Sequence, residues 1–173
     1  MIGANGIGNL HHQRGFTLLE MMIALSIVAI LTVIAIPMFR DSALRNTLTV
    51  QSNDLVAGAL TARSEAIKRR AAVSLCASTD NLTCTNTRWE RGWIVRATDG
   101  TIVQIHKAAP TGFLINADST NISFDASGLA ASLANLTICR ATPSAGNQER
   151  VITINATGKS SIAKTSTGIC TTP

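Results

Sequence analysis

Hydrophobic side chains are concentrated near one end of the chain and alternate with polar ones over much of the rest. Residues 16–39 form an apolar run whose single charged side chain is Glu20. At 1.5 Å per residue, a helix over this run is about 36 Å long, enough to cross a bilayer with some tilt. A removable secretory signal has a shorter apolar stretch, followed by a small-residue cleavage site. The pattern therefore predicts a membrane-spanning helix, in which an unpaired carboxylate costs about 1–3 kcal/mol.

The following segment keeps a helical period but becomes amphipathic. Its apolar positions recur at spacings of three, four and seven residues: Leu44, Leu48, Leu55, Ala59, Ala62 and Ala66. We therefore expect residues 40–72 to form the water-exposed half of one long helix, with this stripe packed against a globular head. The cations Lys68, Arg69 and Arg70 stand in its last turn, where the helix dipole favours them.

Beyond residue 72 the pattern changes to short, strand-like segments. Residues 92–98 and 101–107 flank Asp99 and Gly100, a dipeptide typical of a tight hairpin turn. Further strands are predicted at residues 73–76, 121–124, 136–139, 150–155 and 161–164. One helix followed by a run of strands predicts an α+β fold with an antiparallel head.

The four cysteines are Cys76, Cys84, Cys139 and Cys170. An even number behind a membrane-targeting segment favours disulfides in an oxidising compartment, and three pairings are open. A zinc site is the alternative, but no Cys-x-x-Cys spacing occurs, and His106 is the only histidine after residue 12. We expect no metal site.

Enzymatic motifs are missing from the sequence. It contains no nucleophile elbow, no His-Glu-x-x-His and no Gly-rich phosphate loop. Trp89 and Trp93 are expected to pack in the core, and His106 to lie on a strand without a catalytic role. We expect no catalytic residues and no cofactor. The net charge of +5 permits nucleic acid or an anionic surface as a partner but requires neither.

The segment "RGFTLLE" at residues 14–20 resembles the leader junction of type IV pilins and type II secretion pseudopilins. The resemblance implies a leader peptide at residues 1–15, cleavage between Gly15 and Phe16, and N-methylation of Phe16. It also makes Glu20 the fifth mature residue, which pairs with the N-terminal amine of a neighbouring subunit. Pro37 stands where this family commonly has a helix-distorting proline. An opposite charge would offset the desolvation of the Glu20 carboxylate.

The head is similar to the GspH/FimT family of minor pilins and pseudopilins. The matching pieces, in the family's order, are "ARSEAIKRR", "VSLCAS", "WERGWIV", "ISFDASG", "LTIC" and "RVITINATGK". The resemblance implies the type IV pilin fold, a long N-terminal helix packed on an antiparallel β-sheet head at residues 73–173. It also implies disulfides that join Cys76 to Cys84 and Cys139 to Cys170.

The function implied by this resemblance is that of a minor pilin in the priming or tip complex of a type IV pilus. Its partners would be prepilin peptidase, the inner membrane, and other major and minor pilins through the N-terminal helix. The precursor would be a single-pass protein of a bacterial inner membrane with its head in the periplasm, and the assembled pilus would stand at the cell surface. One alternative is the H-type minor pseudopilin of type II secretion.

A second alternative is a DNA-binding minor pilin for DNA uptake. In some FimT-type pilins a Gly-Arg-x-Arg motif binds DNA, and the matching residues here are Gly158, Lys159, Ser160 and Ser161. Lysine contacts phosphate but lacks the bidentate fork of arginine. The candidate residues are Lys159, Lys164, Arg150 and Arg140. Their contacts would be to the DNA backbone, weak and sensitive to salt.

Overall fold

The computed structural model describes residues 15–141 and 148–165, which form one long helix, a short 3₁₀ helix and eight strands. The chain divides into two compact units, Met1–Arg40 and Asp41–Pro173. All of the buried core lies between Leu48 and Ile154, so the second unit holds a complete hydrophobic core of its own. The predicted α+β class with a long N-terminal helix is confirmed.

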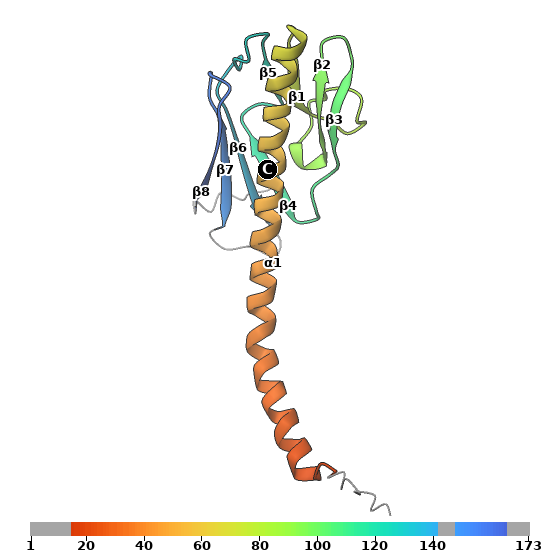
Figure 1. Ribbon diagram of the computed structural model, residues 1–173, viewed down its shortest axis with the longest axis vertical. Helices are drawn as coiled ribbons and strands as arrows, with labels where there is room; N and C mark the ends of the chain where they lie inside the picture. The colour runs from red at the N-terminus through yellow and green to blue at the C-terminus, as the bar shows by residue number, and fades with distance from the viewer. Residues whose placement is uncertain (1–14, 142–147, 166–173) are drawn as a thin grey trace, which may run out of the picture. The chain divides into compact units, whose positions relative to one another are not determined.

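Helix α1 spans Leu18–Arg69 (Figure 1). It ends because Arg70 adopts a left-handed conformation with φ of 52°. The N–H of Arg70 then donates to the Ile67 carbonyl, and the N–H of Ala71 to the Ala66 carbonyl. This pair of bonds is a Schellman motif, which satisfies carbonyls at the helix end. The helix therefore stops earlier than the predicted end at residue 72.

The part of α1 in the first unit exposes its large apolar side chains. The most apolar stretch of 18 residues in α1 has a mean hydropathy of 2.6, and none of its residues is buried. By length and composition, the helix is long and apolar enough to cross a membrane. Phe16 and Phe39, at the two ends of the run, are 76% and 78% exposed. Exposing a contiguous apolar surface of this size to water is unfavourable, which indicates a surface that contacts lipid or other helices.

The second unit contains two antiparallel four-stranded sheets (Figure 1). The first has the order β3-β2-β1-β5, with β1 Val73–Ala77, β2 Trp93–Ala97, β3 Ile102–His106 and β5 Asn121–Phe124. The second has the order β4-β6-β7-β8, with β4 Phe113–Ala117, β6 Ala134–Arg140, β7 Glu149–Ile154 and β8 Ser160–Thr165. The 3₁₀ helix η1, Trp89–Arg91, precedes β2.

Each of the seven predicted strand segments matches an observed strand, whereas β4 was not predicted. Its sequence, FLINA, has two polar or small residues at its end. The predicted hairpin at Asp99 and Gly100 is confirmed between β2 and β3. The N–H of Gly100 donates to the Ala97 carbonyl, and Gly100 has φ of 91°, as in a three-residue loop with glycine in the left-handed position.

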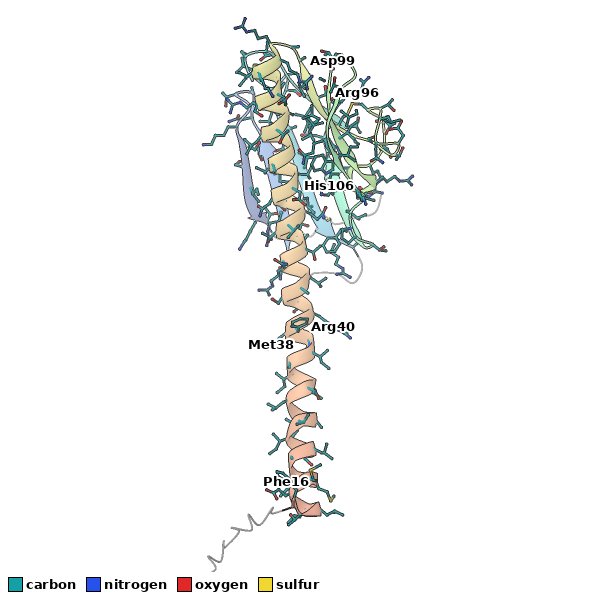
Figure 2. The ribbon with its side chains drawn as sticks, turned by 45° about the vertical axis from the view of Figure 1, so that its right-hand side comes forward. Phe16, Met38, Arg40, Arg96, Asp99 and His106 are labelled. Carbon is teal, nitrogen blue, oxygen red and sulfur yellow. A yellow bond between two sulfur atoms is a disulfide. The ribbon has the colours of Figure 1, made fainter. Side chains whose placement is uncertain are left out.

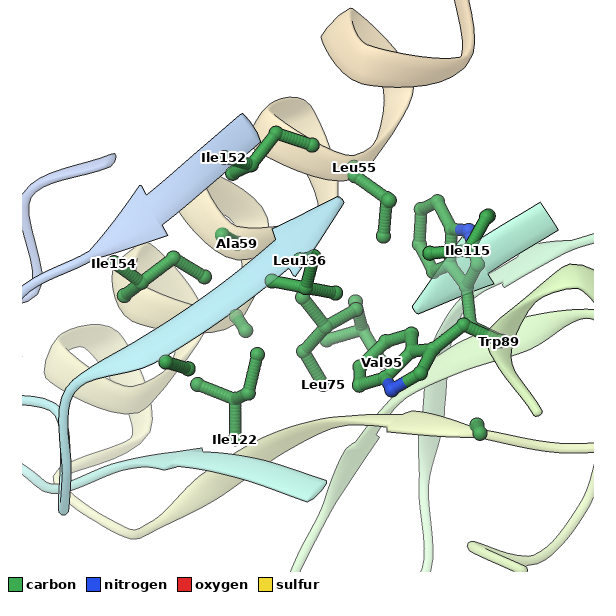
Figure 3. Packing of buried hydrophobic residues seen from close by; sticks show 14 of the residues in the cluster. Leu55, Ala59, Leu75, Trp89, Val95, Ile115, Ile122, Leu136, Ile152 and Ile154 are labelled. Carbon is green, nitrogen blue, oxygen red and sulfur yellow. The ribbon is translucent and has the colours of Figure 1, made fainter. Parts of the chain in front are cut away.

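The amphipathic stripe of α1 packs against the head, as predicted, and it contacts both sheets. Figure 3 shows Leu55 and Ala59 of the helix beside Leu136 and Ile152 of the second sheet, with Val95 and Trp89 deeper in the cluster. Leu48, Leu55, Ala59, Ala62 and Ala66 are at most 1% exposed, and Leu44 is partly buried against them.

Gly58 is a point of close contact between the helix and the first sheet. A Cβ at this position would lie 2.6 Å from Cζ3 and 2.7 Å from Cη2 of Trp93. Trp93 is 1% exposed and Trp89 is 2% exposed, and the Trp89 indole N–H donates to the Ser119 carbonyl at 2.8 Å. Both tryptophans therefore pack in the core, as predicted.

Cys76 and Cys84 form a disulfide, as the resemblance implied. The loop that it closes is organised by Asp80, whose carboxylate accepts hydrogen bonds from the Leu82 and Thr83 N–H groups and from the Ser78 and Thr83 hydroxyls. These donors, led by Thr83, hold the pKa of Asp80 well below its ordinary value. Cys139 lies in β6, but Cys170 is outside the described residues, so that pairing stays a prediction.

Candidate assembly site

The N-terminal end of α1 is capped by Thr17. The Glu20 N–H donates to Thr17 Oγ1 at 3.2 Å, which makes Thr17 the N-cap and Glu20 the third residue of the helix. Thr-x-x-Glu is the sequence of a capping box, and an acidic residue in the first turn also complements the helix dipole. This cap was not predicted, although the spacing of Thr17 and Glu20 is visible in "TLLE".

Glu20 lies in an open groove on one side of the helix. The groove is lined by Thr17, Leu19, Glu20, Ile23, Ala24 and Ile27, so nearly all of its wall is apolar. Across residues 15–141 and 148–165, no basic side chain forms an ion pair with Glu20. A carboxylate among apolar groups is stable only with a counter-charge or in contact with water. The groove can therefore receive a cation from outside the described chain.

Three further residues of the predicted assembly segment lie in this unit. Gly15 and Phe16 precede the helix in irregular backbone, so the Gly15–Phe16 peptide bond is not locked in a helical hydrogen-bond ladder. Pro37 lies inside α1, where it has no N–H to donate to the Val33 carbonyl. Phe16, whose exposed side chain is labelled in Figure 2, stands at the start of the apolar surface.

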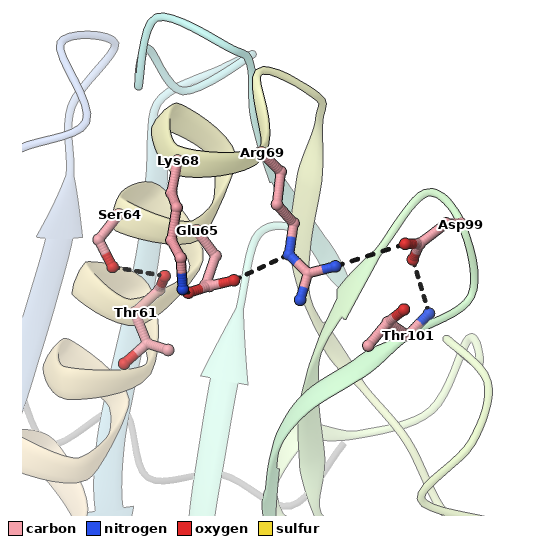
Figure 4. A network of polar contacts seen from close by, with 7 residues as sticks. All are labelled: Thr61, Ser64, Glu65, Lys68, Arg69, Asp99 and Thr101. Atoms are coloured by element: carbon pink, nitrogen blue, oxygen red, sulfur yellow. Dashed lines mark hydrogen bonds and ion pairs between the residues drawn. The ribbon is translucent and has the colours of Figure 1, made fainter.

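Of the cations Lys68, Arg69 and Arg70, the first two lie in the last turn of α1 and have local acidic partners (Figure 4). Lys68 and Arg69 both form ion pairs with Glu65, at 3.2 Å and 2.8 Å, and Arg69 reaches Asp99 of the β2–β3 turn at 3.4 Å. The bond from Arg69 is the main cause that lowers the pKa of Glu65. Because these pairs are exposed, they stabilise the fold only weakly.

His106 lies in β3, as expected of a strand histidine. Its ring stacks on Trp93, with the two centroids 4.6 Å apart and the planes 4° apart. Its Nε2 lies 3.1 Å from Asp54 Oδ2 on α1, and its Nδ1 lies 2.9 Å from the Lys107 carbonyl. The histidine thus ties β3 to the helix. Over the described ranges, no group of three metal-ligating side chains comes together.

The four basic candidates for DNA contact differ in their exposure and location in the structure. Lys159 is exposed in the β7–β8 turn, and Lys164 is exposed near the other end of β8. Arg150 is only 6% exposed, so its guanidinium is not presented to a large ligand. Arg140 is half-buried, with its guanidinium carbon 5.1 Å from the centre of the Phe113 ring. The four residues do not form one exposed surface.

The position of Lys159 is fixed by contacts of the preceding glycine. Gly158 has φ of 73°, and a Cβ there would lie 2.3 Å from the Gly128 carbonyl oxygen and 3.1 Å from Arg63 Nε. Arg63 Nε itself donates to the Gly128 carbonyl at 3.0 Å. The β7–β8 turn is therefore packed tightly on the neighbouring turn and on α1, and only glycine fits.

An apolar helix with a prepilin-like start, joined to a disulfide-bonded β head, defines a pilin-like protein. Residues 51–158 match the family described as type II transport protein GspH, and residues 10–36 match the prokaryotic N-terminal methylation motif. The first match spans more than half of the chain. This chain therefore belongs to the GspH family.

Solved structures of the same fold come from both pili and secretion systems. The type IV minor pilin FimU of Pseudomonas aeruginosa has 22% sequence identity and a TM-score of 0.56, and the match covers 69% of this chain and 90% of that one. The minor pseudopilin EpsH of the type 2 secretion system of Vibrio cholerae has 11% identity and a TM-score of 0.51, with coverage of 68% and 96%. At these identities the likeness establishes the fold alone.

The N-terminal part also resembles a curated relative. A type IV major alpha-pilin of Moraxella bovis is 44% identical over 46 residues, which are 27% of this chain and 29% of the relative. The chain thus matches less than a third of the length of that pilin. The pilin-like class agrees with the resemblance found in the sequence, and the apolar helix with its methylation motif fits a membrane-anchored pilin.

Proposed function

We propose that this protein is a minor pilin of a type IV pilus, which is held in the inner membrane by the first half of α1 and then assembled into a priming or tip complex. The observation that carries the proposal is the exposed apolar unit with one carboxylate, Glu20, at the third residue of the helix. A subunit of this kind is stable in lipid or among similar helices, and not in water.

Maturation would begin at the Gly15–Phe16 bond, which lies outside the helix and close to its cap. Cleavage by prepilin peptidase frees the amine of Phe16, which is then N-methylated. In the filament, the Glu20 carboxylate of one subunit pairs with the amine of a neighbour. The attraction of the two charges in an apolar environment offsets the cost of removing them from water. The head would stay in the periplasm and reach the cell surface with the pilus.

The experiment that tests this role follows processing and assembly separately. A Glu20→Ala variant should be cleaved after Gly15 but should not co-purify with the filament, because the groove then has no charge to hold the neighbour's amine. Met22→Leu is the matched control, since it keeps an apolar side chain on the same helix. Normal incorporation of the Glu20→Ala subunit would overturn the proposed use of this carboxylate.

The H-type minor pseudopilin of type II secretion is the second candidate, because the similar folds include EpsH. The two machines are separated by deleting the gene and measuring piliation and protein secretion in the same strain. We expect piliation to fall while secretion is unchanged. Loss of secretion with normal piliation would instead assign the chain to the secretion system.

DNA uptake is tested by titrating duplex DNA into residues 41–173, the unit with the complete core, at low and moderate salt. Arg150 is buried and Arg140 is half-buried over the Phe113 ring, so the exposed candidates are Lys159, which directly precedes β8, and Lys164 near the other end of β8. They offer two separate point charges to phosphate. We expect no measurable binding at moderate salt. Micromolar binding that is lost in a Lys159→Ala, Lys164→Ala double variant would assign the DNA-uptake role.

A further inference from the structure

Arg150 is a charged group in the interior of the head with only neutral partners. Its side chain is 6% exposed. The guanidinium donates to the Glu149 carbonyl at 3.1 Å and to the Thr49 hydroxyl of α1 at 3.5 Å. Within the described residues it forms no ion pair with a carboxylate. A buried cation without a counter-ion is costly, and its field is poorly screened by water.

A second cation lies directly beside it. In the antiparallel register Arg150 is opposite Lys164 of β8 on one side and opposite Ile138 of β6 on the other. Residues that are directly opposite project from the same face of a sheet, and like charges in such a pair repel each other. Lys164 is exposed, so an anion from solution can reach it and relieve both charges.

The helix adds a third cation to the same corner. Arg45 is exposed and precedes Thr49 by four residues, so both lie on one side of α1. The Thr49 hydroxyl also donates to the Arg45 carbonyl at 3.0 Å. We name Arg45, Thr49, Arg150 and Lys164 the basic corner.

Two acidic residues lie near the basic corner. Asp41 is exposed, one turn before Arg45. Glu149 is buried beside Arg150 in the chain, but successive side chains of a strand point to opposite faces, and its carboxylate accepts a hydrogen bond from Thr165. The three cations therefore have two carboxylates nearby, and the Glu149 carboxylate lies on the opposite face of the sheet from Arg150.

The position of Arg45 along α1 suggests which ligand the basic corner binds. Phe39 ends the apolar run, and Arg45 follows six residues later, which is about 9 Å of helix. The headgroup layer of a bilayer extends about 5–7 Å beyond the hydrocarbon on each side. An arginine side chain on this turn is therefore within reach of lipid phosphates when the apolar run spans the membrane.

We propose that the basic corner binds the headgroup phosphate of an anionic phospholipid while the subunit is anchored in the membrane. Arg45 and Lys164 contact the phosphate, and Arg150 strengthens its attraction from behind. The inference rests on the proposed membrane-anchored stage. It adds a lipid preference that assembly into a filament does not require.

The test uses the full chain reconstituted in bilayers of mixed phosphatidylcholine and phosphatidylglycerol. Native mass spectrometry then measures the ratio of the two lipids that stay bound. The test variant is Arg45→Ala, Lys164→Ala. The matched control is Lys68→Ala, Lys159→Ala, which removes the same charge from the last turn of α1 and from the turn before β8. At about fivefold per cation, we expect phosphatidylglycerol enrichment to fall about 25-fold in the test variant and to persist in the control.

Two outcomes would overturn the proposal: no enrichment of phosphatidylglycerol by the natural chain, or an equal loss of that enrichment in the test variant and in the control. Saturable binding of inorganic phosphate by residues 41–173, at equal ionic strength and without lipid selection, would indicate a site for free phosphate. Binding of duplex DNA at the basic corner without lipid selection would indicate a nucleic-acid site. A chain that does not insert into the bilayer at all would refute the proposed function instead.

Discussion

The backbone N–H of Glu20 donates to the hydroxyl of Thr17 at 3.2 Å, so the residue proposed to drive assembly is held in the first turn of a capped helix. The first four N–H groups of a helix have no partner within it, and in lipid such groups are especially costly. Thr17 satisfies one of them and fixes the backbone from which the Glu20 side chain projects.

Replacing Thr17 by valine should weaken assembly without removing any charge. The variant loses the cap, which costs about 1 kcal/mol, and frays the turn that carries Glu20. Less of the subunit should co-purify with the filament, whereas Thr17→Ser, which keeps the hydroxyl, should behave as the natural chain. Equal incorporation of the valine and serine variants would show that the cap has no part in assembly.

Gly158→Ala should destabilise the head more than Gly100→Ala. Both glycines have positive φ, which costs a residue with a Cβ of the order of 1 kcal/mol. Only at Gly158 would the Cβ also collide with a backbone oxygen, at 2.3 Å, whereas at Gly100 the nearest atom is the end of the Arg96 side chain at 3.6 Å. Urea unfolding of residues 41–173 measures the difference, which we expect to exceed about 1 kcal/mol. Equal losses would mean that the two turns are not packed together.

Gly58→Ala should cost about 1–3 kcal/mol, because its methyl group would overlap the Trp93 ring. The cost should shrink in a Trp93→Phe background, since the smaller ring lacks the two atoms that are overlapped. A double-mutant cycle by urea unfolding gives the coupling free energy. Additive effects would place the strain elsewhere than between these two residues.

Removing the disulfide by Cys76→Ser, Cys84→Ser should lower the free energy of unfolding by about 2–3 kcal/mol, as for a short closed loop. Reductant should lower the free energy of unfolding of the natural chain by at least the same amount. In the serine variant, reductant should cause a smaller loss, because only the pair predicted at Cys139 and Cys170 remains to be reduced. Peptide mapping under oxidising conditions checks that second pair. If reductant destabilised the natural chain no more than the double substitution does, this result would argue against a second disulfide.

The stability of the head should fall in acid, in part through Asp80. Hydrogen bonds hold the pKa of Asp80 below that of an unfolded aspartate, and the pKa values of Asp99 and Asp125 are lowered by donors in their own turns. With a depressed folded pKa, the stabilisation is complete above the ordinary carboxyl pKa of about 3.9 and is lost as the pH falls toward the folded value.

Urea midpoints between pH 7 and pH 2 measure this effect. The midpoint of the natural head should decline below about pH 4, and Asp80→Asn should decline less steeply from a lower starting value. Parallel pH profiles of the two proteins would show that the Asp80 carboxylate does not contribute to acid sensitivity.

The sequence by itself determined the elements whose signal is local. The apolar run with Glu20, the stripe from Leu48 to Ala66 and the paired hairpin strands each depend on a repeat that is visible within a few residues. The end of α1 was predicted too late, because the left-handed turn at Arg70 depends on backbone bonds that the residue type does not favour. Strand β4 was missed although it is as long as β1, β2 and β3, because its pairing with β6 is a contact distant in sequence.

Only the tertiary structure decided which side chains share a surface. Lys159, Lys164, Arg150 and Arg140 are equally basic in the sequence, yet the fold buries Arg150 beneath Thr49 and separates Lys159 from Lys164 by the length of β8. The pairing of β7 with β8 places Arg150 opposite Lys164, and the bond from Arg150 to Thr49 joins them to the part of α1 that carries Arg45, more than 100 residues earlier in the chain. Burial and cross-strand register are set by contacts distant in sequence, so no local pattern could have revealed the basic corner.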